Sequence, residues 1–323
     1  MSETSQAASG LPAKSLPHVI GLAFGRYQKF VKTFAWSALR TFPGCQVTIL
    51  LDKLPNNRTR DLLEEAASAY GGSVTYDTYA VAAFSSAAIR HVPIAGGSLK
   101  LLRWLYMPDP VVNTKILVAD IDTVFLRTKA DVYWHIVDSD TKSSYFNVRR
   151  AGEQRISGGN HYILSPAYWN ETAEARDFLW REEPNAIVDR LGRELLEQDR
   201  GYFRDEQLLW WICLNASPAP WQLPIVGTEV QTYQRIPGVH YGPARNSARY
   251  SVFRDDDLSA LRSELQSNDF KEWVAANGDY LLKQVVAFAQ HQQVPSKILS
   301  RLVQVWLQAN PNSLMAKHRK LWS

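Results

Sequence analysis

The chain has 323 residues, of which 46% are hydrophobic and 21% are charged, and its formal net charge is +4. This length allows a sizeable hydrophobic core in one large domain or two joined domains, and the composition is typical of a globular protein. The charge is too small to predict a nucleic-acid-binding protein, and two cysteines are too few for a disulfide framework.

Strands and helices alternate in the first third of the chain. Apolar runs predict strands at 19–24, 46–53 and 73–79, and helical spacing of apolar residues predicts helices at 26–39 and 58–70. This alternation predicts a parallel sheet with crossover helices, in which ligands bind at the carboxyl ends of the strands. Three residues lie at or near those ends: Gly25, Asp52 and Asp77.

A fourth apolar strand runs into two carboxylates. A helix is predicted at 98–106, and the strand ILVA that follows it leads into Asp120 and Asp122. Residues i and i+2 of an extended strand point to the same side, so both carboxylates would face one ligand if the strand stays extended. Carboxylates this close repel each other unless a cation lies between them, and a hard divalent ion is the usual solution. Such an ion can bridge the oxygens of a diphosphate.

The Asp-x-Asp pattern alone is not specific, since 138–140 and 255–257 also satisfy it. Two classes of enzyme end a buried strand in this way. In haloacid-dehalogenase-like phosphatases the first Asp is a nucleophile and the second a general acid, and Asp120, Asp122 and Val124 fit that motif. In glycosyltransferases of the GT-A fold the two carboxylates bind a metal at the end of a central strand. The phosphatase motif normally lies on the first strand of its domain, so three preceding strands favour the glycosyltransferases.

The rest of the chain adds further motifs. Strands are predicted at 144–148 and 160–165, and helices at 172–180, 186–198 and 205–213. From Asp257 to the end the pattern predicts mostly helices. Between Val19 and Arg245 the sequence resembles GT-A glycosyltransferases, nearest in pattern to the glycogenin and bacterial lipopolysaccharide galactosyltransferase group. Besides the Asp-x-Asp strand, five stretches carry this resemblance: AFGRY, SLKLLRWLYMP, ISGGNHYILSP, DEQLLWW and GVHYG.

The resemblance implies an α/β fold with a Rossmann-like, mostly parallel central sheet and flanking helices, and the helical pattern after it predicts a helical C-terminal extension. The composition of 1–17 predicts a disordered tail, so the catalytic domain is expected at 18–250 and the extension at 251–323. Within the catalytic domain, 18–125 is expected to bind the nucleotide sugar and 126–250 to bind the acceptor and carry the catalytic residues.

The same resemblance implies the residues of the site. Asp120, Asp122 and His240 would bind the metal, although GVHYG is one residue shorter than the family's His-x-x-Gly loop. A nitrogen ligand added to carboxylates favours Mn²⁺ over Mg²⁺. The catalytic candidates near the reacting sugar carbon are Asp205, Glu206 and Gln207. The other candidates for donor binding are Ala23, Phe24, Gly25, Arg26, Asp52, Lys100, Arg103, Ile121, Gly159, Asn160 and Gly242.

The expected reaction is metal-dependent transfer of a hexose from a nucleotide diphosphate sugar, with a UDP-sugar favoured, to a hydroxyl of a glycan, glycolipid or other acceptor. Retention of configuration is favoured over inversion. Two alternatives stay open: a haloacid-dehalogenase-like phosphatase with Asp120 as nucleophile, and a non-catalytic module that binds a nucleotide or glycan. A nucleic-acid partner is not expected.

The sequence has no apolar run that would span a bilayer and no signal-peptide pattern, so a cytoplasmic protein is expected. The residues after Asp279 include basic side chains and no acidic ones. The apolar stripe predicted at 297–310 would either dock on the catalytic domain or rest on the inner face of a membrane that carries a lipid-linked acceptor.

Overall fold

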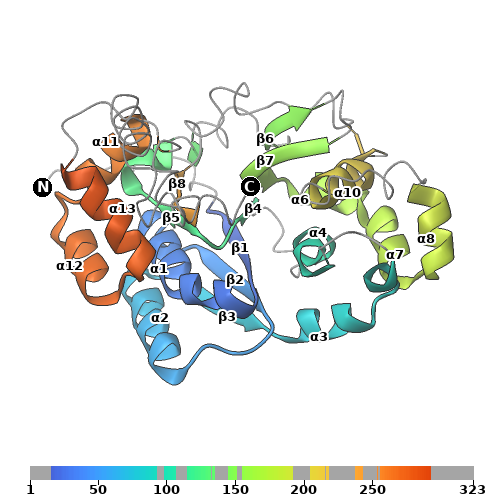
Figure 1. Cartoon of the computed structure of the whole chain (residues 1–323), viewed down its shortest axis with the longest axis horizontal. Helices are drawn as coiled ribbons and strands as arrows, with labels where there is room; N and C mark the ends of the chain where they lie inside the picture. The colour runs from blue at the N-terminus through green and yellow to red at the C-terminus, as the bar shows by residue number, and fades with distance from the viewer. Residues whose placement is uncertain are drawn as a thin grey trace, which may run out of the picture.

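The computed structural model describes residues 16–92, 98–106, 115–131, 133–134, 145–150, 155–191, 204–214, 216–217, 237–242, 253 and 255–291. Within them, a six-stranded sheet has the order β3-β2-β1-β4-β7-β6, and a separate two-stranded sheet pairs β5 with β8 (Figure 1). The strands are β1 (His18–Ala23), β2 (Gln46–Leu51), β3 (Ser73–Asp77), β4 (Ile116–Ala119), β5 (Thr123–Phe125), β6 (Tyr145–Arg150), β7 (Arg155–Leu164) and β8 (Gly238–His240).

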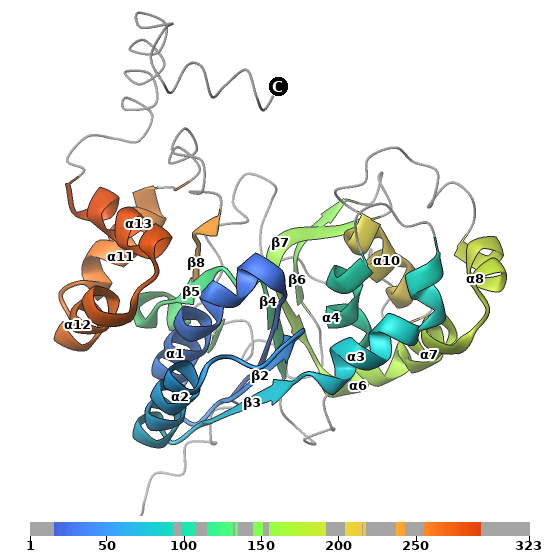
Figure 2. The same cartoon turned by 60° about the horizontal axis from the view of Figure 1, so that its bottom comes forward.

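Helices lie on both faces of the large sheet (Figures 1 and 2). The α-helices are α1 (Val31–Thr41), α2 (Asn57–Tyr70), α3 (Tyr79–Ser86), α4 (Leu102–Leu105), α6 (Pro166–Glu171), α7 (Ala173–Arg181), α8 (Pro184–Leu191), α10 (Arg204–Cys213), α11 (Asp255–Glu264), α12 (Asn268–Asn277) and α13 (Tyr280–His291). The 3₁₀ helices are η1 (Gly25–Phe30), η2 (Ala88–His91), η3 (Ser98–Leu101) and η4 (Arg127–Lys129). None of the helices among the described residues is both long and apolar enough to cross a membrane.

The four strands β1 to β4 form the parallel part of the sheet. β1 pairs in parallel with β2 and with β4, and β2 pairs in parallel with β3. β7 runs antiparallel to both β4 and β6. The prediction of an α/β fold with a mostly parallel sheet, flanking helices and a helical C-terminal part is therefore confirmed.

Alternate residues of the central strands enter two separate hydrophobic cores. On β1, Val19 and Ala23 pack in one core with α1, α2 and the C-terminal helices. Ile20 and Leu22 pack on the opposite face with α3, α4, α7 and α10. This alternation is the period of two expected of a strand, and it explains why both faces of β1 are apolar.

The predicted elements of the first third are present, with shifted ends. The helix predicted at 26–39 begins as the 3₁₀ helix η1 and becomes α-helical at Val31. The helix predicted at 58–70 is α2, which the Asn56 side chain caps by accepting the Thr59 N–H at 2.9 Å. It ends at Gly71, whose φ of 68° is readily accessible to glycine.

Further differences concern elements along the whole chain. Gly158 and Gly159, which the pattern left open as a turn, lie inside β7. The sequence pattern did not predict α3, α6 or the short strands β5 and β8. The apolar stripe predicted at 297–310 lies outside the described residues.

The C-terminal helices α11, α12 and α13 pack beside α1 (Figures 1 and 2). Trp36 of α1 stacks on Trp273 of α12, with ring centroids 4.0 Å apart. Phe270 and Leu282 are fully buried and belong to the same core as Phe34. These helices therefore share a hydrophobic core with the sheet.

Buried ion pairs reinforce this packing. Arg40 of α1 is 1% exposed, and its guanidinium donates to Glu264 at 2.6 Å and to Asp269 at 2.8 and 3.0 Å. Hydrogen bonds from Arg40 hold the pKa of Asp269 well below its ordinary value. Glu264 also accepts the backbone N–H of Thr128 at 2.7 Å. Each charge is therefore paired, as a buried charge requires.

Replacing Arg40 by alanine is expected to destabilise the protein. Glu264 would remain buried without its cation, so the free energy of unfolding should fall by about 3–5 kcal/mol. Urea unfolding, followed by tryptophan fluorescence, measures the change. The matched control is Arg181→Ala, at an exposed position on α7, which should stay within about 0.5 kcal/mol of the wild-type protein. Equal stability of the two variants would contradict a stabilising role for the Arg40 ion pairs.

Candidate metal centre

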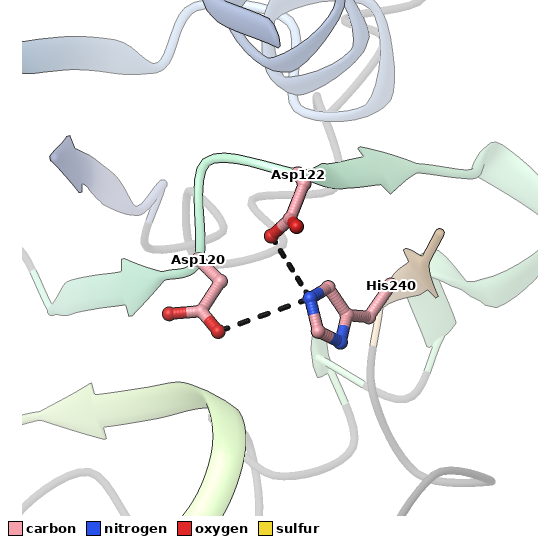
Figure 3. A group of neighbouring side chains, drawn as sticks. All are labelled: Asp120, Asp122 and His240. Atoms are coloured by element: carbon pink, nitrogen blue, oxygen red, sulfur yellow. Dashed lines mark hydrogen bonds and ion pairs between the residues drawn. The ribbon is translucent and has the colours of Figure 1, made fainter. Parts of the chain in front are cut away.

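The strand that leads to the two carboxylates is β4, which ends at Ala119 as the run ILVA predicts. A turn follows, in which the Thr123 N–H donates to the Asp120 carbonyl at 3.1 Å. β5 begins at Thr123, so the chain does not stay extended through Asp122. Asp120 and Asp122 face one point because the chain turns between them (Figure 3).

The short strand β8 brings His240 to this turn. β5 and β8 pair antiparallel, with Thr123 opposite His240, and the Tyr241 N–H donates to the Asp122 carbonyl at 3.0 Å. Gly238 permits the close approach, because a Cβ at this position would lie 2.4 Å from the Val124 carbonyl oxygen. Any larger residue would push β8 away from β5 and move His240.

One ligand atom from each of Asp120, Asp122 and His240 lies within 4.8 Å of the other two. The His240 Nε2 is 2.8 Å from the Asp122 Oδ1 and 3.9 Å from the Asp120 Oδ2 (Figure 3). Asp122 is buried, at 4% exposure, whereas Asp120 and His240 are partly exposed. Two carboxylates and one imidazole form a donor set that fits a divalent cation, and partial exposure leaves room for a ligand from solution.

The ion pair between Arg103 of α4 and Asp120 adds a positive charge beside the three ligands. The guanidinium also lies over the ring of Trp104, 4.5 Å from its centroid. The ion pair limits the rotation of the Asp120 carboxylate. Lys100, the other predicted basic residue, lies in η3 one turn earlier and is partly buried.

The turn after β1 lies at the same edge of the sheet. Ala23 ends β1 and is buried, and Gly25 follows with a φ of 53°. The Gly25 N–H donates to the Asp52 carboxylate at 3.0 Å, and the Gln28 side chain donates to its other oxygen. Asp52 therefore holds the turn in place from the end of the neighbouring strand. Phe24 is partly buried and Arg26 is exposed.

β7 lies beside β4 on the side opposite β1. Ala119, the last residue of β4, pairs with His161, and Asn160 and Gly159 lie in β7 just beyond this last pair. Ile121 is buried in the core, and Gly242 is buried next to Tyr241. The donor-binding roles of these residues, including contacts of Gly159 and Asn160 with a sugar, stay predictions.

The three catalytic candidates lie in the first turn of α10, which packs against β7. Gln207 is buried, at 8% exposure. For Asp205 and Glu206 the structure describes the backbone, and their catalytic role stays a prediction. The GVHYG motif contains Gly238 and Tyr241, but the sequence pattern assigns neither of them a role.

No protein-family model matches the chain, and no curated protein matches it. Similar solved structures include the glycosyltransferase GlyE of Streptococcus pneumoniae TIGR4 (13% identity, 67% of this chain and 46% of that chain, TM-score 0.40). The galactosyltransferase LgtC in complex with donor and acceptor sugar analogs has 13% identity, with 81% and 96% coverage and a TM-score of 0.41.

The mannosyltransferase PcManGT from Pyrobaculum calidifontis, in complex with GDP-Man and Mn²⁺, has 10% identity, with 96% and 88% coverage and a TM-score of 0.34. All three are glycosyltransferases, the class that the sequence resembles, and the chain spans less than half the length of GlyE. Because these TM-scores are below 0.5, the function proposed below rests on the geometry of the site.

Replacing Gly238 by alanine is expected to weaken metal binding. The new Cβ would overlap the Val124 carbonyl, and the displaced β8 would carry His240 away from Asp122. We expect the Kd for Mn²⁺ to rise roughly tenfold or more, as when a metal ligand is misaligned. Isothermal titration with Mn²⁺ measures this change.

The control is Gly71→Ala at the end of α2, where the added Cβ meets no atom but the φ of 68° is strained for alanine. That variant should lose about 1–2 kcal/mol of stability and keep its affinity for Mn²⁺. If both variants bind Mn²⁺ like the wild-type protein, the close approach at Gly238 does not position His240.

Proposed function

We propose that this protein is a metal-dependent glycosyltransferase of the GT-A type. It would transfer a hexose from a nucleotide diphosphate sugar to an acceptor hydroxyl. The observation that carries the proposal is the convergence of Asp120, Asp122 and His240 at the carboxyl end of a parallel sheet. Three ligands of this kind suit a divalent ion whose remaining positions face a diphosphate.

The position of the site within the sheet supports this proposal. β1 has β2 on one side and β4 on the other, so the direction of strand addition reverses between β1 and β4. In open α/β sheets, ligands bind at the carboxyl ends of the strands that flank such a reversal. Gly25 follows β1 and Asp120 follows β4. If the turn after β1 binds the nucleotide, its diphosphate would therefore lie near the candidate metal ligands at the end of β4.

When bound, a divalent cation would neutralise the charge that develops on the leaving nucleoside diphosphate. Arg103 holds the Asp120 carboxylate and contributes a further positive charge at the same place. Asp122 and His240 complete the ligand set from the adjoining turn and strand. We assign the donor-binding role to the turn at Ala23–Arg26, to Asp52 and Lys100, and to the β7 backbone at Gly159 and Asn160.

The proposed catalytic residues on the acceptor side lie in α10. We propose that Gln207, or one of its neighbours Asp205 and Glu206, lies near the anomeric carbon. Inversion would need a carboxylate base that takes the proton of the acceptor hydroxyl. Retention would instead use an oxygen of the leaving phosphate, with a polar group such as Gln207 near the opposite face of the sugar. We favour retention, a UDP-sugar and Mn²⁺, with a glycan or a lipid-linked acceptor. The cytoplasmic location and a peripheral membrane contact through the basic C-terminal residues also stay predictions.

The phosphatase alternative has less support. It requires Asp120 to attack phosphorus, whereas Asp120 is paired with Arg103 and lies beside His240. The run Asp255–Asp257, which could serve as the additional acidic pair of such an enzyme, starts α11. Its buried member Asp257 forms an ion pair with Lys129. That carboxylate is therefore engaged in holding the C-terminal helices.

A panel of nucleotide sugars with Mn²⁺ tests the proposal. We expect one donor to be hydrolysed slowly without an acceptor, and this hydrolysis to stop when EDTA removes the metal. Asp122→Ala should abolish it, because the buried carboxylate contributes directly to the ligand set. Asp61→Ala, on the exposed face of α2, is the matched control and should retain full activity.

The remaining outcomes separate the alternatives. Rapid hydrolysis of simple phosphate esters with a covalent aspartyl-phosphate at Asp120 would establish the phosphatase. Binding of a nucleotide sugar without turnover, in the presence of a range of acceptors, would indicate a non-catalytic module. Full metal-dependent activity in Asp122→Ala would refute the assigned metal site.

A further inference from the structure

Tyr241 connects the candidate metal centre to the C-terminal helices. It follows His240 directly and is fully buried. Its backbone N–H donates to the Asp122 carbonyl at 3.0 Å. Its hydroxyl donates to the Oδ2 of Asp279 at 2.7 Å, just before α13. One residue thus contacts both the turn that carries Asp122 and the beginning of a helix that is distant in sequence.

Asp279 is itself held by several groups. Its Oδ1 accepts the backbone N–H groups of Leu281 at 3.0 Å and Leu282 at 3.1 Å, in the first turn of α13. The Thr33 hydroxyl of α1 lies 3.5 Å from its Oδ2. The acceptor of the Tyr241 hydroxyl is therefore fixed by both α13 and α1, so it forms a rigid anchor.

The Tyr241 ring is fixed as well. It packs edge-on against Phe30, with ring centroids 5.4 Å apart and an interplanar angle of 87°. The hydroxyl of this packed ring donates to Asp279 at 2.7 Å.

β8 needs such an anchor, because it is only three residues long and pairs with a strand of equal length. A two-stranded pairing of this size is marginally stable by itself. A metal site, by contrast, requires its ligands to stay aligned, and the groups behind the ligands supply that alignment. The tertiary contacts of Tyr241 therefore stabilise the position of β8, which the short β5–β8 pairing alone would not fix.

We propose that Tyr241 is a positioning residue for the metal centre. Through its bond to Asp279, it holds His240 and the Asp122 turn in the geometry that binds the cation. The docking of α13 is then part of the metal site, although α13 contributes no ligand among the described residues. This inference rests on the metal-binding function proposed above.

Mn²⁺ affinity of the full-length protein tests this role. In Tyr241→Phe the ring still packs on Phe30, and Asp279 keeps its two backbone donors, so the fold should be retained. The Kd for Mn²⁺ should rise roughly tenfold, which is typical of losing a group that orients a metal ligand. Asp279→Asn leaves one side-chain oxygen, which cannot both accept from Tyr241 and cap α13, so the Kd of this variant should rise as well.

Tyr280→Phe is the matched control. Tyr280 is adjacent to Asp279 but 77% exposed, and its hydroxyl accepts from Gln284 at 2.7 Å. This variant makes the same chemical change outside the metal site and should bind Mn²⁺ like the wild-type protein. All titrations are made well below the unfolding temperature of each variant, so that a loss of stability alone does not alter the Kd.

Turnover provides a second readout. If Tyr241 only aligns the ligands, saturating Mn²⁺ should restore the kcat of Tyr241→Phe to the wild-type level. Equal Mn²⁺ affinity in Tyr241→Phe and the wild-type protein would overturn the positioning role. Failure of the wild-type protein itself to bind Mn²⁺ would instead overturn the proposed metal-dependent function, so the two failures are distinguishable.

Discussion

The repulsion between Asp120 and Asp122 is the constraint on which the rest of the site depends. A turn brings ligand atoms of both residues, together with one of His240, within 4.8 Å of one another. Two carboxylates this close are stable only with positive charge or hydrogen-bond donors around them. Arg103 supplies the charge at Asp120, and His240 pairs with Asp122. A divalent cation between the three would satisfy the same requirement more completely.

The supports for this arrangement come from distant parts of the chain. β8 reaches the turn because Gly238 allows its backbone to approach β5. Tyr241 then connects β8 to Asp279 and α13. The C-terminal helices are held against α1 by the buried Arg40 ion pairs and by the stacking of Trp36 on Trp273. The metal centre therefore depends on packing that involves much of the described chain.

Local pattern was sufficient to predict the parallel part of the sheet. Apolar runs with turn residues after them identified β1 and β2 to within a few residues, because buried strands need apolar side chains on both faces. The partly exposed strand β3 was also predicted to within a few residues. The same reasoning located the carboxylates at the end of β4. It did not find β5 or β8, since three-residue strands are too short to show a period.

The details of the site depend on contacts that no local pattern contains. The turn at Asp120–Thr123 is stabilised by pairing with β8, which lies far along the chain. The family resemblance pointed to His240 as the third ligand, and the structure brings its side chain to the two carboxylates. It offered no signal for Tyr241 and Asp279, because their hydrogen bond exists only once the helices are packed.

The two hydrophobic cores on opposite faces of the sheet have a consequence for how such a protein can diverge. Val124, Val239 and Tyr241, which surround the ligand-bearing turn, pack in one core. α10, with the catalytic candidates in its first turn, packs in the other. Changes of side-chain volume on well-separated residues have nearly independent effects. Substitutions in the core around α10 can therefore accumulate in one layer while the core residues around the turn at Asp120–Asp122 are preserved in the other.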